Sequence, residues 1–115
     1  MIRPSALCFF PDDVRGEFRR PPIGERIECH KYLQDVVEGN ADPRRMARVC
    51  RSSHPEAYER PLGTNSVVFA VERFPDSNEI AVVILFAGRS TRPGAVFEAR
   101  IVAPRLAELK KELQR

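Results

Sequence analysis

The sequence is poor in the residues that usually reveal a binding or catalytic site. Its 115 residues include no tryptophan, only two histidines, and three widely spaced cysteines at Cys8, Cys29 and Cys50. An odd number of distant cysteines without a Cys-x-x-Cys pair argues against both a disulfide framework and a thiolate zinc site. A reducing compartment, the cytoplasm, is therefore the expected location.

Long hydrophobic runs and phosphate-binding glycine loops are also missing. No apolar stretch approaches the roughly 20 residues of a membrane span, and the one near Met1 is too short for a signal peptide. Neither His30 nor His54 has carboxylates at ligand spacing, and no P-loop or dinucleotide-binding glycine motif occurs. We therefore expect no membrane association, no metal and no cofactor, and a single domain over 1–115.

Lysine is scarce, whereas arginine is abundant. Three lysines accompany sixteen arginines among the nineteen basic residues, and the net charge is +3. A GC-rich genome is one explanation, because its codons favour arginine, alanine and proline. Phosphate recognition is the other, since a planar guanidinium matches phosphate geometry better than an ammonium does.

Two apolar runs predict the centre of the fold. Ser66–Val71 and Glu79–Gly88 are apolar at successive positions, so both faces of each strand should be buried. The short, turn-rich segment 74–78 between them predicts an antiparallel hairpin. Something must then cover each face of the sheet.

The flanking segments predict helices and one more strand. Residues 5–10 form an expected first strand, 12–20 a short helix, and 24–37 an amphipathic helix that ends at Gly39-Asn40. The segment 51–63 reads as a loop or irregular strand, and 94–103 as either a half-exposed strand or a helix. Pro104 is expected to open a last helix with an apolar stripe at Leu106, Leu109 and Leu113.

The predicted class is α+β: an antiparallel sheet with a buried central hairpin, two helices before it and one C-terminal helix. The C-terminal stripe or a second subunit, in a two-fold dimer, would cover the second sheet face.

The strongest local signal is Asp42-Pro43, an N-cap acceptor followed by proline at the first helical position. A helix there would place Arg44, Arg48 and Arg51 on one face. This face is either a phosphate-binding ridge or an ordinary solvated surface. A second basic loop after the hairpin adds Arg89 and Arg92, which completes the predicted nucleic-acid-binding set.

Acid–base chemistry without a metal would need a proton acceptor, a proton donor and a cation. His54, Tyr58 and Arg60 are spaced so that they could meet at one edge of the sheet. Histidine titrates near neutrality, which suits this role, although His54 beside Pro55 is equally readable as a plain loop residue. His30 borders the apolar stripe of its helix and is interpreted as a histidine at the edge of the core.

The order of strand, helical pair and meander, with the strand ending Gly88-Arg89, resembles the RelE/ParE toxin superfamily over about residues 25–92. The resemblance implies a ribosome-dependent endoribonuclease or a gyrase-directed toxin, with an antitoxin-like protein as partner. The chain departs from the family pattern at Ser66 and Ser90, where basic residues are expected. It departs again at Val96 or Phe97, where the family has an aromatic hydroxyl.

Two functional hypotheses follow from the sequence. The first is a RelE/ParE-like basic module that binds or acts on RNA, the ribosome or a protein target. The second is a non-enzymatic, homo-oligomeric interaction domain in which the arginine content reflects genome composition.

Overall fold

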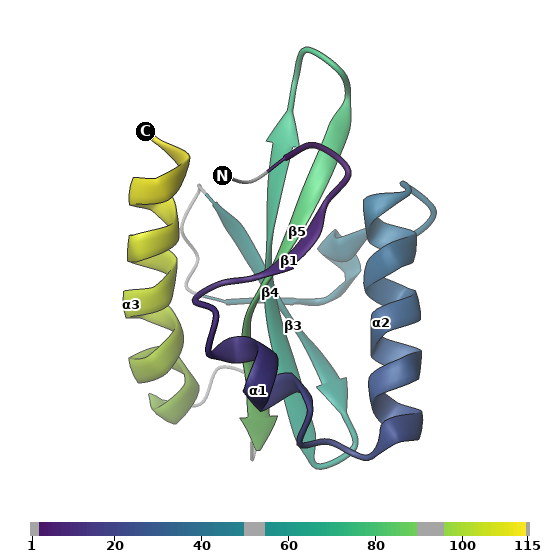
Figure 1. The fold of residues 1–115 in the computed structure, drawn as a ribbon, viewed down its shortest axis with the longest axis vertical. Coiled ribbons are helices and arrows are strands. Elements are labelled where there is room, and N and C mark those ends of the chain that lie inside the picture. The colour runs from purple at the N-terminus through teal and green to yellow at the C-terminus, as the bar shows by residue number, and fades with distance from the viewer. Residues whose placement is uncertain (1–2, 50–54, 90–95, 115) are drawn as a thin grey trace.

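The protein folds around one mixed β-sheet with helices on both faces. The computed structural model describes residues 3–49, 55–89 and 96–114, with the side chains of 96–99 excepted (Figure 1). The five strands are β1 (Leu7–Phe9), β2 (Ala47–Arg48), β3 (Glu56–Leu62), β4 (Asn65–Phe74) and β5 (Glu79–Arg89). The α-helices are α1 (Val14–Phe18), α2 (Ile23–Val37) and α3 (Val96–Leu113). The strand order is β1-β5-β4-β3-β2, which agrees with the predicted α+β class.

The central hairpin is buried on both faces, as its apolar runs predict. β4 and β5 pair antiparallel and lie in the middle of the sheet. Along β4, Val67 and Phe69 face α1 and α2, whereas Val68 and Ala70 face α3. Because successive side chains of a strand point to opposite faces, two cores need two apolar sets, and the uninterrupted run supplies both.

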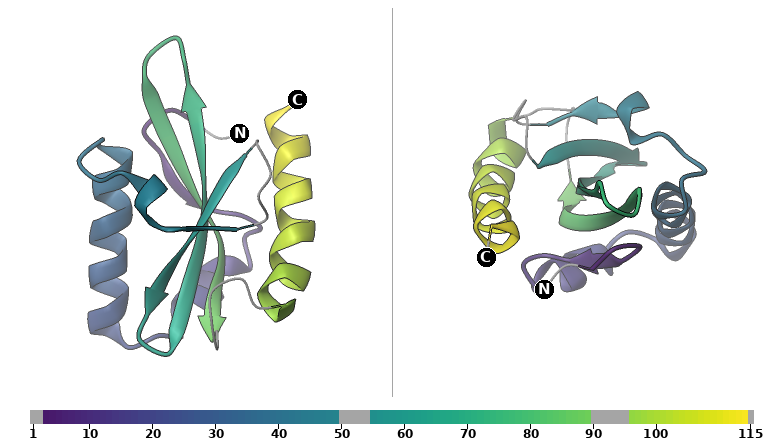
Figure 2. Two further views of the ribbon diagram at one scale, coloured as in Figure 1. Left: turned by 180° about the vertical axis from the view of Figure 1, so that it is seen from behind. Right: turned by 90° about the horizontal axis from the view of Figure 1, so that it is seen from above.

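The two sheet faces are covered within one chain. Viewed from above, α2 and α3 lie on opposite sides of the sheet (Figure 2). Leu106 and Leu109 of the predicted stripe are buried against β5, and Leu113 is half-buried. α3 begins at Val96, so of the two alternatives for 94–103 the helix is the one found over the described part, and Pro104 lies inside the helix rather than opening it. The second sheet face therefore needs no second subunit.

β1 joins the sheet parallel to β5, with Leu7 opposite Val82 and Phe9 opposite Ile84. The other three strand pairings are antiparallel. The predicted antiparallel sheet is thus extended by one parallel edge strand, brought alongside β5 from near the start of the chain.

The helix predicted from Asp42 is wrong. The Asp42 side chain does accept a hydrogen bond from the backbone N–H of Arg44, at 3.0 Å, as an N-cap should. The helix nevertheless has only three residues, Pro43–Arg45, in 3₁₀ geometry (η1), and the chain then pairs with β3 as the short strand β2. Val49 explains why the helix stops there, because Val49 is buried on the α3 side and its N–H donates to the carbonyl of Ala57 at 2.9 Å. Strand pairing with β3 and the burial of Val49 stabilise the extended chain more than the local sequence signal stabilises a helix.

A bulge in β5 is held by an ion pair that links helices from opposite faces. Val68 pairs with Phe86 and Phe69 with Ile84, so Leu85 has no residue opposite it. Arg105 of α3 donates to the Leu85 carbonyl at 2.7 Å and to both carboxylate oxygens of Glu17 of α1, at 2.9 and 2.6 Å. Glu17 also accepts the N–H of Ala87 at 3.2 Å. We call these four residues the bulge clamp.

Candidate nucleic-acid interface

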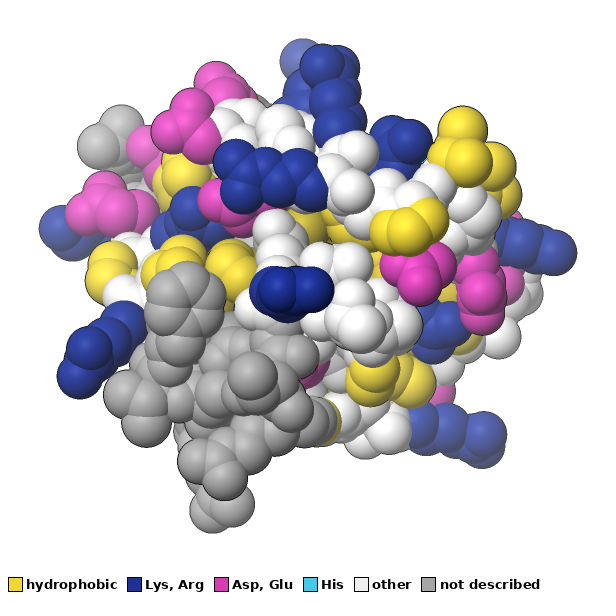
Figure 3. All heavy atoms as spheres, turned by 90° about the horizontal axis from the view of Figure 1, so that it is seen from below, with side chains coloured by type: hydrophobic (Ala, Val, Ile, Leu, Met, Phe, Trp, Pro, Cys, Tyr) yellow, Lys and Arg dark blue, Asp and Glu magenta, His cyan; other side chains and the backbone are white. Residues whose placement is uncertain are grey.

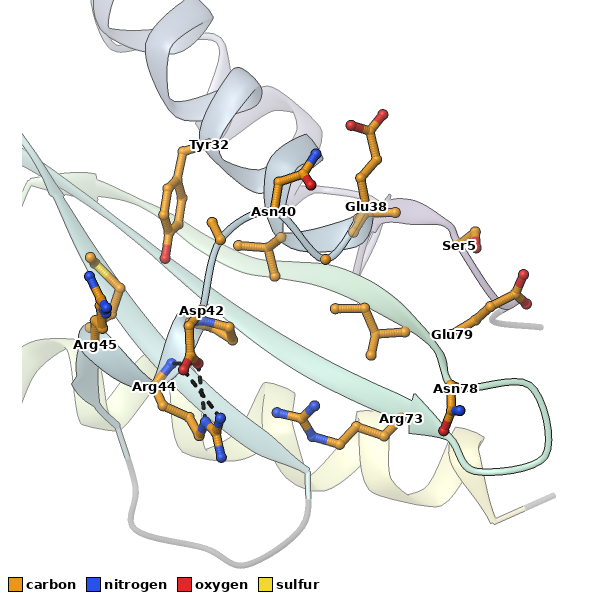
Figure 4. Close-up of a pocket in the computed structure, with 17 residues that line it drawn as sticks. Ser5, Tyr32, Glu38, Asn40, Asp42, Arg44, Arg45, Arg73, Asn78 and Glu79 are labelled. Carbon is orange, nitrogen blue, oxygen red and sulfur yellow. Dashed lines mark hydrogen bonds and ion pairs between the residues drawn. The ribbon is translucent and has the colours of Figure 1, made fainter.

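A concave surface lies between the C-terminal end of α2 and the edge of the sheet. Its cavity volume is about 920 Å³, and its walls come from the end of α2, the loop 39–42, η1 and the far end of the β4–β5 hairpin (Figure 4). Three arginines line it, Arg44, Arg45 and Arg73, together with the Tyr32 side chain. We call this surface the arginine groove.

Strand alternation places a fourth arginine, Arg48, close to the arginines of the groove. Glu56, Tyr58 and Arg60 occupy alternate positions of β3 and so share the sheet face that carries α2. Tyr58 donates its hydroxyl to Glu56 at 2.8 Å, and Glu56 pairs with Arg73 at 3.2 Å. Arg48, opposite Tyr58 in the register, places its guanidinium 5.9 Å from the Tyr58 ring centre.

Two carboxylates in this cluster are held in their charged form. Hydrogen bonds from the Arg44 side chain and backbone keep the pKa of Asp42 below its usual value. Burial would raise the pKa of Glu56, but hydrogen bonds from Arg73 and Tyr58 outweigh burial and lower it. Arg44, Arg45 and Arg73 thus lie with Asp42 and Glu56 at this end of the groove, with Arg48 close by, whereas Glu38 and Glu79 lie at the other end.

The other end of the groove is different in chemistry. In Figure 4, Glu38 and Glu79 lie on the side away from Arg44 and Arg45, with Asn40 and Asn78 also in the lining. Carboxylate and amide oxygens are acceptors for the amino groups of nucleobases. The groove therefore offers cations for phosphate at one end and acceptors for base edges at the other.

The Tyr32 hydroxyl is a donor without a hydrogen-bond partner among the described residues. It is buried, and it points from α2 toward Asp42 (Figure 4). Burial raises the pKa of Tyr32, an effect that the charge of Arg60 only partly offsets, so the hydroxyl stays protonated at neutral pH. It can donate to an oxygen that enters the groove.

The predicted catalytic residues are not assembled as a set in the described structure. Tyr58 and Arg60 share one face of β3, and His54 lies outside the described residues. Tyr58 is 2% exposed, and burial and the neighbouring Glu56 raise its pKa. Its phenol is therefore neutral, and its hydroxyl hydrogen is already donated to Glu56. Arg60 lies 4.1 Å from the Tyr32 ring centre and pairs with Glu28 at 3.7 Å. Arg60 thus links β3 to α2, and Tyr58 packs against Phe69 of β4.

The structure divides the predicted nucleic-acid-binding set. Arg44 of η1 lines the groove and Arg48 of β2 lies over the Tyr58 ring, so the two do not share one helix face. Arg89 pairs in register with Asn65, at the end of the hairpin opposite Arg73. The remaining two predicted members, Arg51 and Arg92, lie outside the described residues.

Sequence reasoning missed Arg45, Arg73 and Tyr32. Arg73 was detectable, because it lies two positions beyond buried Val71 and so shares its face of β4. Tyr32 lies in the helix expected over 24–37, where the sequence pattern gave it no role beyond packing, whereas its ring packs on Phe69 and its hydroxyl reaches the groove. His30, expected at the edge of the core, is exposed on α2.

Other kinds of site find no support in the described ranges. No group of three or more His, Cys, Asp or Glu residues among them is arranged to hold a metal ion. Within the same ranges, no helix has the length and apolar character required to span a bilayer.

The comparisons with known proteins add no relative. The chain matches no family model, no curated protein and no solved structure.

Proposed function

We propose that this protein binds single-stranded RNA through the arginine groove. The observation that carries the proposal is the gathering of Arg44 and Arg45 of η1 and Arg73 of β4 on one concave surface, with Arg48 of β2 close by over the Tyr58 ring. The arginines gather at the end of the groove away from Glu38 and Glu79, and their fork-shaped donors suit phosphate oxygens. A composition effect alone gives no reason for them to gather at one place.

The shape and chemistry of the groove favour a single strand over a duplex. Proteins that read duplex DNA commonly insert a protruding helix or ribbon into the major groove, whereas this surface is concave. Unpaired bases expose hydrogen-bonding edges, which the acceptors Glu38, Asn40 and Asn78 could meet. The Tyr32 hydroxyl supplies one more donor for a phosphate or ribose oxygen.

The resemblance to RelE/ParE toxins points toward the same ligand class. That resemblance rests on the order of strand, helical pair and meander over about residues 25–92, in which the second helix is here the three-residue η1 followed by β2. Ribosomal RNA is accordingly one ligand to test. We limit the proposal to binding, because Tyr58 and Arg60 are engaged in packing and pairing. The acid–base role of His54 stays a prediction.

Fluorescence anisotropy with a labelled single-stranded RNA tests the proposal. Each neutralised phosphate releases condensed counterion, so the logarithm of affinity should fall with the logarithm of salt by about 0.7 per contact. Three or four contacts predict a slope of about −2 to −3. Arg44→Glu combined with Arg45→Glu should abolish binding at physiological salt.

A matched control separates the groove from general charge. Arg100→Glu with Lys110→Glu changes the net charge by the same amount at exposed positions of α3. This variant should keep most of the affinity, and both variants should keep nearly the wild-type melting temperature because all four side chains are exposed. Equal loss in both variants would refute the groove as the site. Absence of salt-sensitive binding by the wild type would instead favour the non-enzymatic interaction domain.

A further inference from the structure

A second surface, on the flank of α2, is apolar and lies apart from the arginine groove. Ile23 and Ile27 are the exposed large hydrophobic residues of the described chain, at 67% and 63% exposure. They lie four residues apart and so form one ridge along the helix. Exposed apolar side chains that are grouped rather than scattered mark an interaction surface.

The ridge borders a shallow groove with a volume of about 580 Å³. Phe18, at the end of α1, forms part of its wall beside the two isoleucines. Polar and charged side chains of α2 between Arg26 and Asp35 form the rest. No residue of this groove lines the arginine groove, so the two surfaces are separate. Figure 3 views the end of the molecule where α2 begins and shows hydrophobic side chains exposed beside Lys and Arg side chains.

The charges around the ridge decide what can cover it. Arg26 and Lys31 line the groove against a single carboxylate, Asp35, and the exposed Arg19 and Arg20 directly follow Phe18. A second copy placed with Ile23 against Ile27 in a two-fold arrangement would bring these basic residues face to face. Like charges at close range oppose that pairing, whereas an acidic partner is attracted.

We propose that the ridge and its groove bind an amphipathic helix of a partner protein, with carboxylates bordering its apolar stripe. Isoleucines at i and i+4 form the kind of ridge that packs into the side-chain grooves of another helix. The partner's leucines would cover Ile23, Ile27 and Phe18. The Asp and Glu side chains of the partner would pair with Arg26 and Lys31 of α2 and with Arg19 and Arg20, which precede α2. This proposal does not depend on RNA binding.

Two synthetic helical peptides of about five turns provide the probe. Both carry leucines at i, i+3, i+4 and i+7, and the remaining positions are glutamate and alanine in one peptide, lysine and alanine in the other. The glutamate peptide should bind at least about tenfold more tightly than the lysine peptide. Ile27→Asn should weaken its binding about tenfold, because a central apolar contact is lost.

Charge variants and a solution measurement complete the test. Arg26→Glu with Lys31→Glu should reverse the preference between the two peptides, whereas Lys110→Glu on α3 should leave it unchanged. Equal binding of both peptides, or binding that is indifferent to Ile27→Asn, would overturn the proposal. A dimer in sedimentation that Ile27→Asn dissociates would also overturn it, in favour of a second copy. Ile27→Asn should leave the RNA affinity intact, so failure here and failure of RNA binding are distinguishable.

Discussion

At the scale of single residues, two-sided burial of the hairpin makes a sharp prediction. Ile84 is fully buried in the core between the sheet and α1 and α2. Ile84→Ala should lower the free energy of unfolding by about 2 to 5 kcal/mol, through lost burial and the cavity left behind. Urea denaturation of the wild type and the variant measures this change in the free energy of unfolding.

The same chemical change at an exposed site is the control. Ile23 is 67% exposed, so Ile23→Ala should change the free energy of unfolding by less than about 0.5 kcal/mol. Similar losses at both positions would contradict the assignment of core and surface. The contrast isolates burial, because the side chain removed is identical.

Residue patterns predicted the core better than the site. The uninterrupted run from Ala81 to Ala87 needs no tertiary information to be recognised as a strand buried on both faces. The site is harder, because Glu56 and Arg60 make β3 look like a polar loop. Their charges are compatible with a sheet only because Arg73, Glu28 and the Tyr32 ring pair with them from other elements. No local pattern shows those partners.

At the scale of elements, the bulge clamp joins α1, β5 and α3. Burial would raise the pKa of Glu17, but hydrogen bonds from Arg105 and the Ala87 N–H outweigh it, so the pKa lies below the usual 4.5. Arg105→Ala should cost about 2 to 3 kcal/mol of unfolding free energy, because it leaves the Glu17 carboxylate and the Leu85 carbonyl without their donor.

The clamp also predicts a pH dependence with a definite sign. A carboxyl whose pKa is lower in the folded than in the unfolded protein stabilises fully above the unfolded value and less as pH falls through the folded value. The advantage of the wild type over Glu17→Gln should thus be constant from pH 8 to about 5 and shrink below about 4.5. Urea titrations across this pH range measure the difference. Glu108→Gln, which removes an exposed pair with Lys111, should show little effect at any pH.

Two elements show why local signals fail at their ends. The Asp42-Pro43 signal correctly placed a cap but could not show that Val49 would be drawn into the core on the α3 side. Pro104 was read as a helix start, whereas α3 already extends from Val96 and Pro104 occupies an exposed position within it. In the first case the decisive interactions, pairing with β3 and burial of Val49, lie outside the residues that carry the signal.

At the scale of the whole molecule, both sheet faces are closed by helices of the same chain. The expectation of a homo-oligomer rested on an uncovered face, and α3 covers it. We therefore expect a monomer of 13.1 kDa in sedimentation at micromolar concentration. A dimer under these conditions would show that another surface, such as the α2 ridge, drives association.

The position of β5 has a consequence for how the chain is made. β5 contacts β1, β4 and all three helices, yet it lies in the last third of the sequence. While a ribosome is still adding residues before Glu79, β1 has no strand to pair with, and α1 and α2 lack the β5 side chains against which they pack. Contacts of long sequence separation form late and slowly. We therefore expect a nascent chain that stays protease-sensitive until β5 has left the ribosome and becomes protected only after that.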